Sequence, residues 1–148
     1  MAITQAVSNS FKVEILKGLH NFTATTGNVF KLALYDSEAT LSASTTAYAT
    51  SDEVGASGTY AAGGGALTNV TPVLSGSTAI VDFADKSYTS ATISAQAAVI
   101  YNSSTVTGLT TNAAVCVLDF GGVKSSSAGT FTITFPAAEA TAAILRIA

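Results

Sequence analysis

The sequence has few of the residue types that most often carry chemistry. It has no tryptophan, one cysteine, one histidine and two prolines in 148 residues, and 10% of its residues are charged, against about 25% in typical soluble domains. The single Cys116 excludes an internal disulfide and a CxxC metal motif, and the single His20 excludes a two-histidine zinc site. The six basic residues form no cluster that would bind a nucleic-acid backbone. We therefore expect no metal, no other cofactor and no nucleic acid to bind.

Small residues, in contrast, are abundant in this sequence. Ala, Thr, Ser and Gly together make up 78 of the 148 residues, and the net charge is −3. Covering a surface rich in hydroxyl and methyl groups costs little free energy, because few charges need desolvating. Two interpretations follow: a surface that is merely neutral, or a protein that works packed against copies of itself or a larger assembly.

Targeting signals are missing from the sequence as given. Residues 1–10 lack the basic start and apolar stretch of a secretory signal. The uncharged span 87–118 is broken by Ser, Thr, Gln and Asn every few residues, so its apolar runs are too short to cross a bilayer of about 30 Å. We expect a soluble protein made in a cytosol, without a membrane partner.

One amphipathic helix is predicted over residues 4–18. Thr4 is its expected N-cap and Gly18 its expected stop. A lone helix of about 15 residues is marginal in water, so its apolar face must dock either on its own domain or on a neighbouring subunit. The apolar residues recur at the i, i+4 spacing of one helical face: Ile3, Val7, Phe11, Ile15, Leu16 and Leu19.

Short strands are predicted for the rest of the chain, residues 28–148. The apolar run 29–35 is typical of a strand buried on both faces, and Pro72 indicates an edge strand or a bulge. Together with the helix, these strands predict a single mainly β domain, 1–148, built as an antiparallel β-sandwich or a jelly-roll-like barrel. The predicted strands are 29–35, 68–74, 78–84, 91–101, 113–120, 130–135 and 142–147.

Local patterns add detail to this β body. In residues 91–101, alternation predicts that Ile93, Ala95, Ala97, Val99 and Tyr101 share one side of a strand. Residues 121–129 are expected to form a loop, entered through an Asx-type turn at Asp119. In 130–135, the three apolar residues are expected to point inward and the three threonines outward. The glycines at 63–65 predict a sharp turn, a hinge or a close approach by another backbone.

Candidate catalytic groups are sparse. His20 follows the helix end, where a histidine is usually a cap or a surface residue, and Cys116 lies in an apolar run where burial raises the thiol pKa and makes it inert. Asp82 and Asp85 are expected to pair with Lys86, the alternative being a calcium site completed by loop carbonyls. No nucleophile–base pair is evident, so we expect no catalytic residues and no enzyme. Five scattered tyrosines leave sugar stacking open.

Seven segments together span nearly the whole chain: 3–22, 30–48, 53–67, 81–88, 97–104, 115–136 and 143–148. Through these segments, the chain resembles a group of small structural proteins from tailed-bacteriophage genomes. The resemblance implies a virion protein assembled in the host cytoplasm. Within that group we expect a head decoration or cement protein that binds the major capsid protein or another virion protein as a homo-oligomer, possibly a trimer. The alternatives are a tail or baseplate adaptor or fibre component, and a carbohydrate-binding module for host adhesion.

Two segments are the predicted contact surfaces of such an assembly. The helix offers an apolar face that must be covered, and the polar excursion 36–50 is long and fits no strand pattern, which is typical of functional loops. The predicted interface residues are Val7, Phe11, Ile15, Leu16, Leu41 and Tyr48.

Overall fold

The fold consists of ten strands and one short helix in the residues that the structure describes, 2–148. The structure is a computed structural model. Its elements follow the order β1 (Ala2–Ile3), β2 (Ala6–Val7), α1 (Asn9–Leu16), β3 (Phe30–Tyr35), β4 (Thr40–Leu41), β5 (Gly65–Ala66), β6 (Asn69–Ser75), β7 (Thr78–Phe83), β8 (Lys86–Asn102), β9 (Ala113–Ile133) and β10 (Leu145–Ile147).

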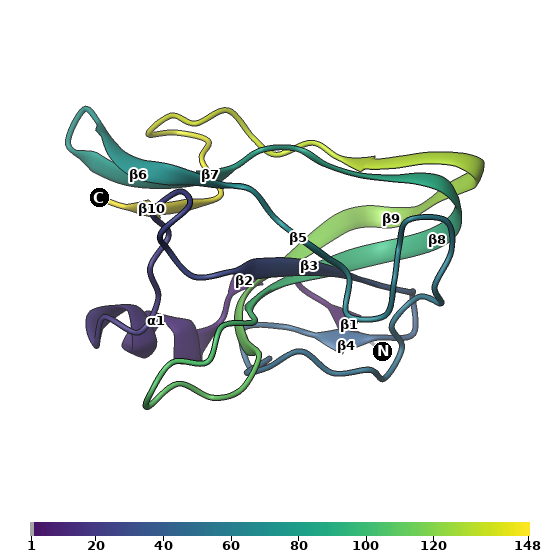
Figure 1. Cartoon of the computed structure of the whole chain (residues 1–148), viewed down its shortest axis with the longest axis horizontal. Helices are drawn as coiled ribbons and strands as arrows, with labels where there is room; N and C mark the ends of the chain where they lie inside the picture. Colours follow the sequence, from purple (N-terminus) through teal and green to yellow (C-terminus); the bar gives the residue numbers. More distant parts are fainter. Residues whose placement is uncertain (1) are drawn as a thin grey trace.

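A long two-stranded ribbon, β8 with β9, organises the molecule. The strands pair antiparallel from Lys86 opposite Ile133 to Asn102 opposite Ala113, well beyond the usual strand length of about 3–10 residues. The ribbon bends back on itself (Figure 1). Register shifts interrupt the pairing near this bend, where Ser90 and Ala128 both have positive φ. Bulged positions of this kind allow a strand to bend.

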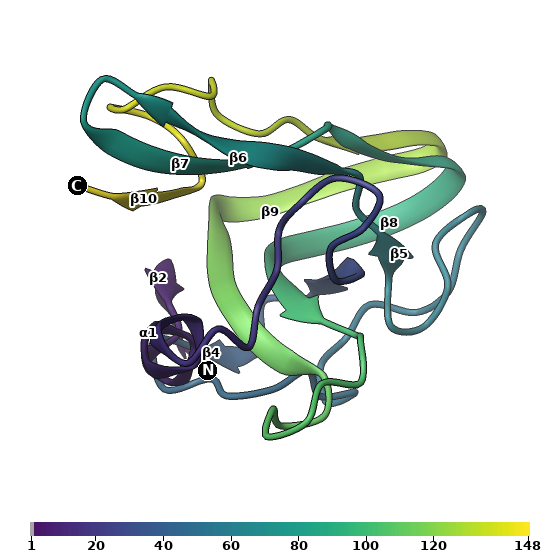
Figure 2. The ribbon, with the colours of Figure 1, turned by 60° about the vertical axis from the view of Figure 1, so that its left-hand side comes forward.

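The bend places two antiparallel sheets one above the other (Figures 1 and 2). One sheet has the order β2-β9-β8-β3-β5, and the other has the order β10-β7-β6. The short strands β1 and β4 form a separate parallel pair. This arrangement confirms the predicted mainly β, antiparallel, sandwich-like class with one helix, and it is not a closed barrel.

Strand β3 of the five-stranded sheet is buried on both faces. Leu32 and Leu34 of β3 belong to the main hydrophobic cluster, whereas their neighbours Ala33 and Tyr35 belong to a second cluster. Because successive side chains of a strand point to opposite faces, the two clusters lie on opposite sides of this sheet. The second cluster is covered by β1, β4 and the excursion 36–50. The predicted strand buried on both faces is therefore confirmed over Phe30–Tyr35, while Val29 is exposed and lies just before it.

The predicted one-sided alternation in 91–101 is wrong. Ile93 and Ala95 pack in the main cluster, whereas Ala97, Val99 and Tyr101 pack in the second. The pairing of β8 with β9 shifts between Ala95 and Ala97, and a shift of one residue moves every following side chain to the other face. An alternation read from sequence alone does not reveal such a shift.

The predicted loop over 121–129 is also wrong, because these residues lie within β9. The glycines and serines there are tolerated since the ribbon is bulged and bent at this point. Two neighbouring predictions are confirmed. The Asp119 carboxylate accepts the N–H of Gly121 at 2.9 Å as an Asx turn, and Phe131, Ile133 and Phe135 are buried.

The helix is shorter than predicted. It spans Asn9–Leu16, and Thr4 lies between β1 and β2 rather than at an N-cap. Ala6 and Val7 pair with Val117 and Cys116 of β9, so sheet pairing replaces helix at the start of the segment. The predicted stop at Gly18 is confirmed: its φ is 71°, and Leu19 N–H donates to the Glu14 carbonyl, as in a Schellman motif.

The hairpin β6–β7 projects at one end of the molecule (Figure 1). β6 is an edge strand, and its register with β7 shifts between Val70 and Val73. Pro72 lies inside that shift, where the missing N–H costs no ladder hydrogen bond. Both features predicted from Pro72, the edge position and the bulge, are therefore present.

Candidate functional site

An apolar groove separates α1 from the three-stranded sheet. It has a volume of about 760 Å³ and is lined by β2, α1, the following chain to Thr23, and the strands β6, β7 and β10. Four of the six predicted interface residues line it, namely Val7, Phe11, Ile15 and Leu16. The structure therefore brings together, in one concave surface, the four predicted interface residues that come from the predicted helix.

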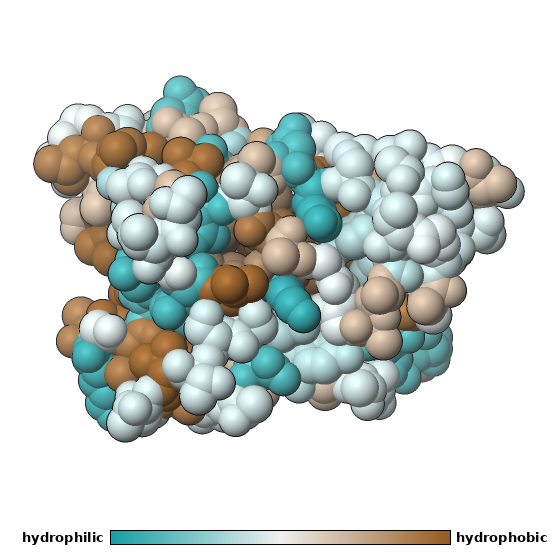
Figure 3. Space-filling model, viewed as in Figure 1, coloured by the Kyte–Doolittle hydropathy of each residue, from teal (hydrophilic) through white to brown (hydrophobic). Residues whose placement is uncertain are grey.

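Exposed apolar side chains gather around this groove. Leu16, Leu74 and Ile147 are exposed by 88, 71 and 64%, and Val13 and Val73 are more than half exposed. These five are the majority of the eight large apolar side chains exposed among residues 2–148. Figure 3 shows apolar side chains concentrated at the end of the molecule that carries the β6–β7 hairpin and α1. A patch of this kind, beside a groove, is typical of an interaction site.

The hairpin half of this surface was not predicted from the sequence. A signal for it was present, because residues 69–81 contain no charged side chain although seven of them are exposed in β6 and the turn. Edge strands usually carry lysine or another charge that discourages pairing with other chains. An uncharged, exposed edge hairpin with Val73 and Leu74 near its tip departs from that pattern.

His20 lies at the base of the groove, and the expectation of a surface or capping position is wrong. The turn after Gly18 folds the chain back under α1, so the His20 side chain is fully buried. Its ring lies 4.9 Å from that of Phe11 and 6.2 Å from that of Phe30, measured between centroids. His20 therefore belongs to the packing that holds α1 against the sheets.

Both ring nitrogens of His20 are engaged within the fold. The Asn102 side-chain amide donates to Nδ1 at 3.0 Å. Because Nδ1 accepts, Nε2 carries a proton and donates to the Glu14 carboxylate at 2.8 Å. The same Asn102 amide also donates to Asn28 at 3.1 Å. This network ties α1, β8 and the chain before β3 together, and it directs the imidazole at a carboxylate and an amide.

The other two predicted interface residues lie away from the groove. Leu41 is buried in the second cluster, and Tyr48 is half-buried against it. The Tyr48 hydroxyl donates to the Glu53 carboxylate at 2.6 Å, which also accepts from Tyr60 at 2.8 Å and from the Gly63 N–H at 2.7 Å. The excursion 36–50 is thus packed against its own sheet, and Leu41 contributes to the chain's own core.

The remaining candidate side chains are buried or make contacts within the fold. Cys116 is buried, and burial raises the pKa of its thiol to about 12, as predicted for an inert cysteine. Asp85 accepts the N–H of Phe135 at 2.9 Å, while the Lys86 ammonium lies over the Tyr88 ring. The expected ion pair of Lys86 with Asp82 or Asp85 does not form among residues 2–148, because Lys86 turns toward the ring instead.

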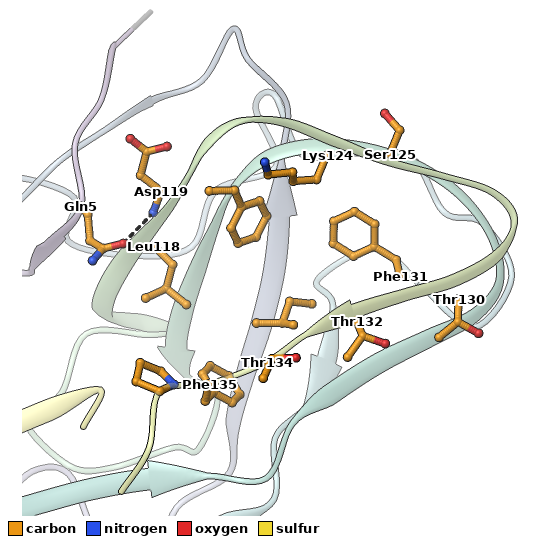
Figure 4. A pocket seen from close by; sticks show the side chains of 13 residues that line it. Gln5, Leu118, Asp119, Lys124, Ser125, Thr130, Phe131, Thr132, Thr134 and Phe135 are labelled. Atoms are coloured by element: carbon orange, nitrogen blue, oxygen red, sulfur yellow. Dashed lines mark hydrogen bonds between the residues drawn. The ribbon is translucent and has the colours of Figure 1, made fainter. Parts of the chain in front are cut away.

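A second hollow, of about 580 Å³, lies inside the bend of β9 (Figure 4). Phe131 and Phe135, which line it, belong to the main cluster. Among residues 2–148, Asp119 and Lys124 are its only charged lining residues. Asp119 is held by its turn, and its N–H donates to Gln5 at 3.2 Å. The hollow therefore lacks converging titratable groups that would act on a substrate.

Comparisons with known proteins add no relative: no family model, no curated protein and no solved structure matches the chain. Within residues 2–148, no group of three or more His, Cys, Asp and Glu side chains is placed to hold a metal ion. The described helix is also too short to cross a bilayer. The groove and the exposed apolar side chains around it are therefore the features of the molecule that bear on its function.

Two substitutions in α1 compare the contribution of a packed side chain to stability with that of an exposed one. Phe11→Asp places a carboxylate against the rings of His20 and Phe22, and we expect a loss of at least about 4 kcal/mol in the free energy of unfolding. Leu16→Asp, on the same helix but almost fully exposed, is expected to change it by less than about 0.5 kcal/mol. Urea unfolding followed by circular dichroism measures both. Equal losses would contradict the assigned packing of α1.

Proposed function

We propose that this chain is a structural protein of a bacteriophage particle, most specifically a head decoration protein that binds the capsid lattice as an oligomer and stabilises it. One observation carries the proposal: the exposed apolar side chains gather around one groove of a weakly charged molecule. The resemblance of the sequence to small phage structural proteins supports the same assignment.

The physical argument concerns the cost of covering a surface. Burying apolar area is favourable by about 25 cal/mol per Å², whereas burying unpaired charges is costly. With 15 charged residues in 148, this surface has little charge to desolvate. On a capsid lattice many modest contacts act together, because neighbours bound to the same particle hold one another in place. Such a protein stabilises a capsid without catalysing a reaction.

The two alternatives receive different support. A tail or baseplate adaptor or fibre component would use the same groove and the same composition. A glycan-binding module needs an exposed aromatic platform, yet Tyr35, Tyr60, Tyr88 and Tyr101 are buried and Tyr48 is half-buried. The tyrosines therefore favour an assembly protein over the adhesion module.

Quantitative mass spectrometry of purified particles tests the proposal. A decoration protein is expected at on the order of hundreds of copies per particle, and a tail ring component at about six or twelve. Absence of the chain from the particles would overturn the proposal. In a second assay, purified chain is added to expanded capsids that lack it. Binding with an increase in the capsid melting temperature supports decoration, and no binding contradicts it.

A further inference from the structure

The groove opens on the side of the molecule where both sheets end. β10 is an edge strand of the three-stranded sheet, and β2 is an edge strand of the five-stranded sheet. Leu145 of β10 and Val7 of β2 both line the groove, which therefore lies between the two edges (Figure 2). Phe11, Phe22 and Leu145 line it and belong to the main hydrophobic cluster. The groove thus reaches the side of the core that neither sheet covers.

The outer edge of β10 is free to pair with another strand. β10 pairs with β7 over Leu145–Ile147, and within residues 2–148 it has no strand on its other side. An unpaired edge offers N–H and C=O groups to an added strand. Because side chains alternate along a strand, Leu145 and Ile147 share one face of β10 and Arg146 lies on the other. An added strand would therefore have apolar neighbours on its core-facing side and a cation on its outer side.

The charged residues along the groove are all basic. Lys12 of α1 and Arg146 of β10 line it, and none of the nine acidic residues does. Neither cation makes an ion pair in the described part of the chain. The Lys12 ammonium donates to the Asn9 side chain at 3.2 Å and the Arg146 guanidinium to the Ala140 carbonyl at 3.1 Å, so each keeps further N–H donors. In a chain of net charge −3, the groove therefore favours an anionic occupant.

The free edge and the two cations together select one kind of occupant. A fatty acid would match the charge but would leave the backbone groups of β10 unpaired. A neutral strand would match the edge but would leave both cations without a partner. An extended segment in which apolar and acidic residues alternate matches both features. Its apolar side chains cover the main cluster beside Leu145, and its acidic side chains lie on the same face as Arg146, where opposite charges on paired strands are stabilising.

We propose that the groove binds an extended segment of a partner protein, with alternating apolar and acidic residues, as an added strand along β10. It rests on the proposed function in taking that partner to be a neighbouring protein of the particle. The added strand lengthens the three-stranded sheet and covers the open side of the core. Its acidic side chains pair with Arg146 on the outer face and with Lys12 across the groove.

Synthetic peptides test this contact on the full chain. The labelled probe Ser-Val-Asp-Val-Glu-Val-Ser has the expected alternation, and a control peptide carries lysine at both acidic positions. In fluorescence anisotropy we expect saturable binding of the acidic peptide, at least about fivefold tighter than binding of the lysine peptide. Two further versions carry N-methyl groups on alternate amides and so block one edge of the peptide or the other. Only one of them is expected to lose affinity, by at least about tenfold, because a strand added to β10 pairs through one edge.

Charge reversal in the chain locates the contact. Arg146→Glu and Lys12→Glu change exposed residues, and circular dichroism checks that both variants fold. Each is expected to weaken binding of the acidic peptide by about threefold to tenfold and to strengthen binding of the lysine peptide. Lys124→Glu is the matched control: it makes the same change at an exposed lysine of β9 that does not line the groove. We expect it to change both affinities by less than about twofold.

Four results would overturn the proposal. They are no saturable binding of the acidic peptide, equal affinity for the acidic and lysine peptides, equal affinity for the two methylated versions, and an effect of Lys124→Glu as large as that of Arg146→Glu. Equal affinity for the methylated versions, with displacement of the probe by sodium dodecanoate, would indicate an apolar anion instead of a strand. Self-association of the chain that Arg146→Glu abolishes would indicate a second copy as the occupant.

The peptide measurements and the particle measurements fail independently. A chain that is abundant in particles but does not bind the acidic peptide would retain the proposed function and lose only this contact. A chain that binds the acidic peptide but is absent from particles would retain the strand-binding groove and lose the proposed source of its partner.

Discussion

Raising the pH from about 10 to about 12 is expected to unfold the chain cooperatively. Burial raises the pKa of Tyr35, Tyr88 and Tyr101 to about 12, against about 10 in an unfolded chain. Burial also raises the pKa of Tyr48 and Tyr60, and hydrogen bonds to the Glu53 carboxylate add to the effect. All five tyrosines therefore resist ionisation while the chain is folded.

The direction of the change in stability follows from how many protons the folded and the unfolded chain bind. Below about pH 10 both states keep the phenolic protons, and the stabilisation is fully present. Between about pH 10 and 12 the unfolded chain releases them first, so the free energy of unfolding falls with pH. Each tyrosine with a pKa near 12 contributes a loss of about 2–3 kcal/mol over that interval. Three such losses are comparable to the whole stability of a typical domain, about 5–15 kcal/mol.

Tyrosinate absorbance and near-ultraviolet circular dichroism, recorded through the same titration, check this expectation. The two signals should change together, because the phenols ionise only when the fold opens. Tyr35→Phe removes one titrating group, and the loss of stability with pH should become shallower by about 1.4 kcal/mol per pH unit. Tyrosinate that forms near pH 10 while the dichroism stays native would contradict the buried positions of these side chains.

Gly64→Ala is expected to lower the free energy of unfolding by about 3–5 kcal/mol. Gly64 has a φ of 74°, which alanine rarely adopts. In addition, a Cβ at this position would overlap the Leu32 carbonyl group and lie 2.9 Å from the Cα of Ala33. These are backbone atoms of a buried central strand, so they cannot move aside at low cost. The predicted close approach of another backbone at the triple glycine is therefore present at this residue.

Gly76→Ala is the matched control. Gly76 has a similar φ of 63°, but a Cβ there meets no atom within 4 Å. Its cost is expected to be about 1 kcal/mol, from the backbone conformation alone. The difference between the two variants in urea unfolding isolates the steric term at Gly64. Similar losses in both would show that the approach to Leu32 does not constrain the fold.

Several predictions that depend on local residues agree with the structure. The strand at 29–35, the edge position of the strand with Pro72, the Asx turn at Asp119 and the helix stop at Gly18 all follow from short-range patterns. Each is set by the conformational preference of one residue or by a period of two or four. The four interface candidates taken from the predicted helix also follow from such a period, and all four line the groove.

Predictions that depend on distant pairing do not agree with the structure. Val7 has the spacing of a helix face, yet it pairs with Cys116 of β9, more than 100 residues away. After Ala95, the alternating side chains of β8 change to the opposite face of the sheet, because the register between β8 and β9 shifts there. His20 is buried because Asn102 and Glu14 meet it there. None of these partners is adjacent in sequence, so no local pattern identifies them.

The sequence by itself determined the mainly β class, the scarcity of catalytic groups and a weakly charged surface, because composition and short-range periodicity fix these properties. Only the tertiary structure decided where the apolar surface lies. The bend at Ser90 and Ala128 stacks the two sheets, and that stacking places α1 opposite β10 and leaves a groove between them. Segments at both ends of the chain and the central hairpin meet there, and contacts over such sequence separations depend on packing of the whole chain.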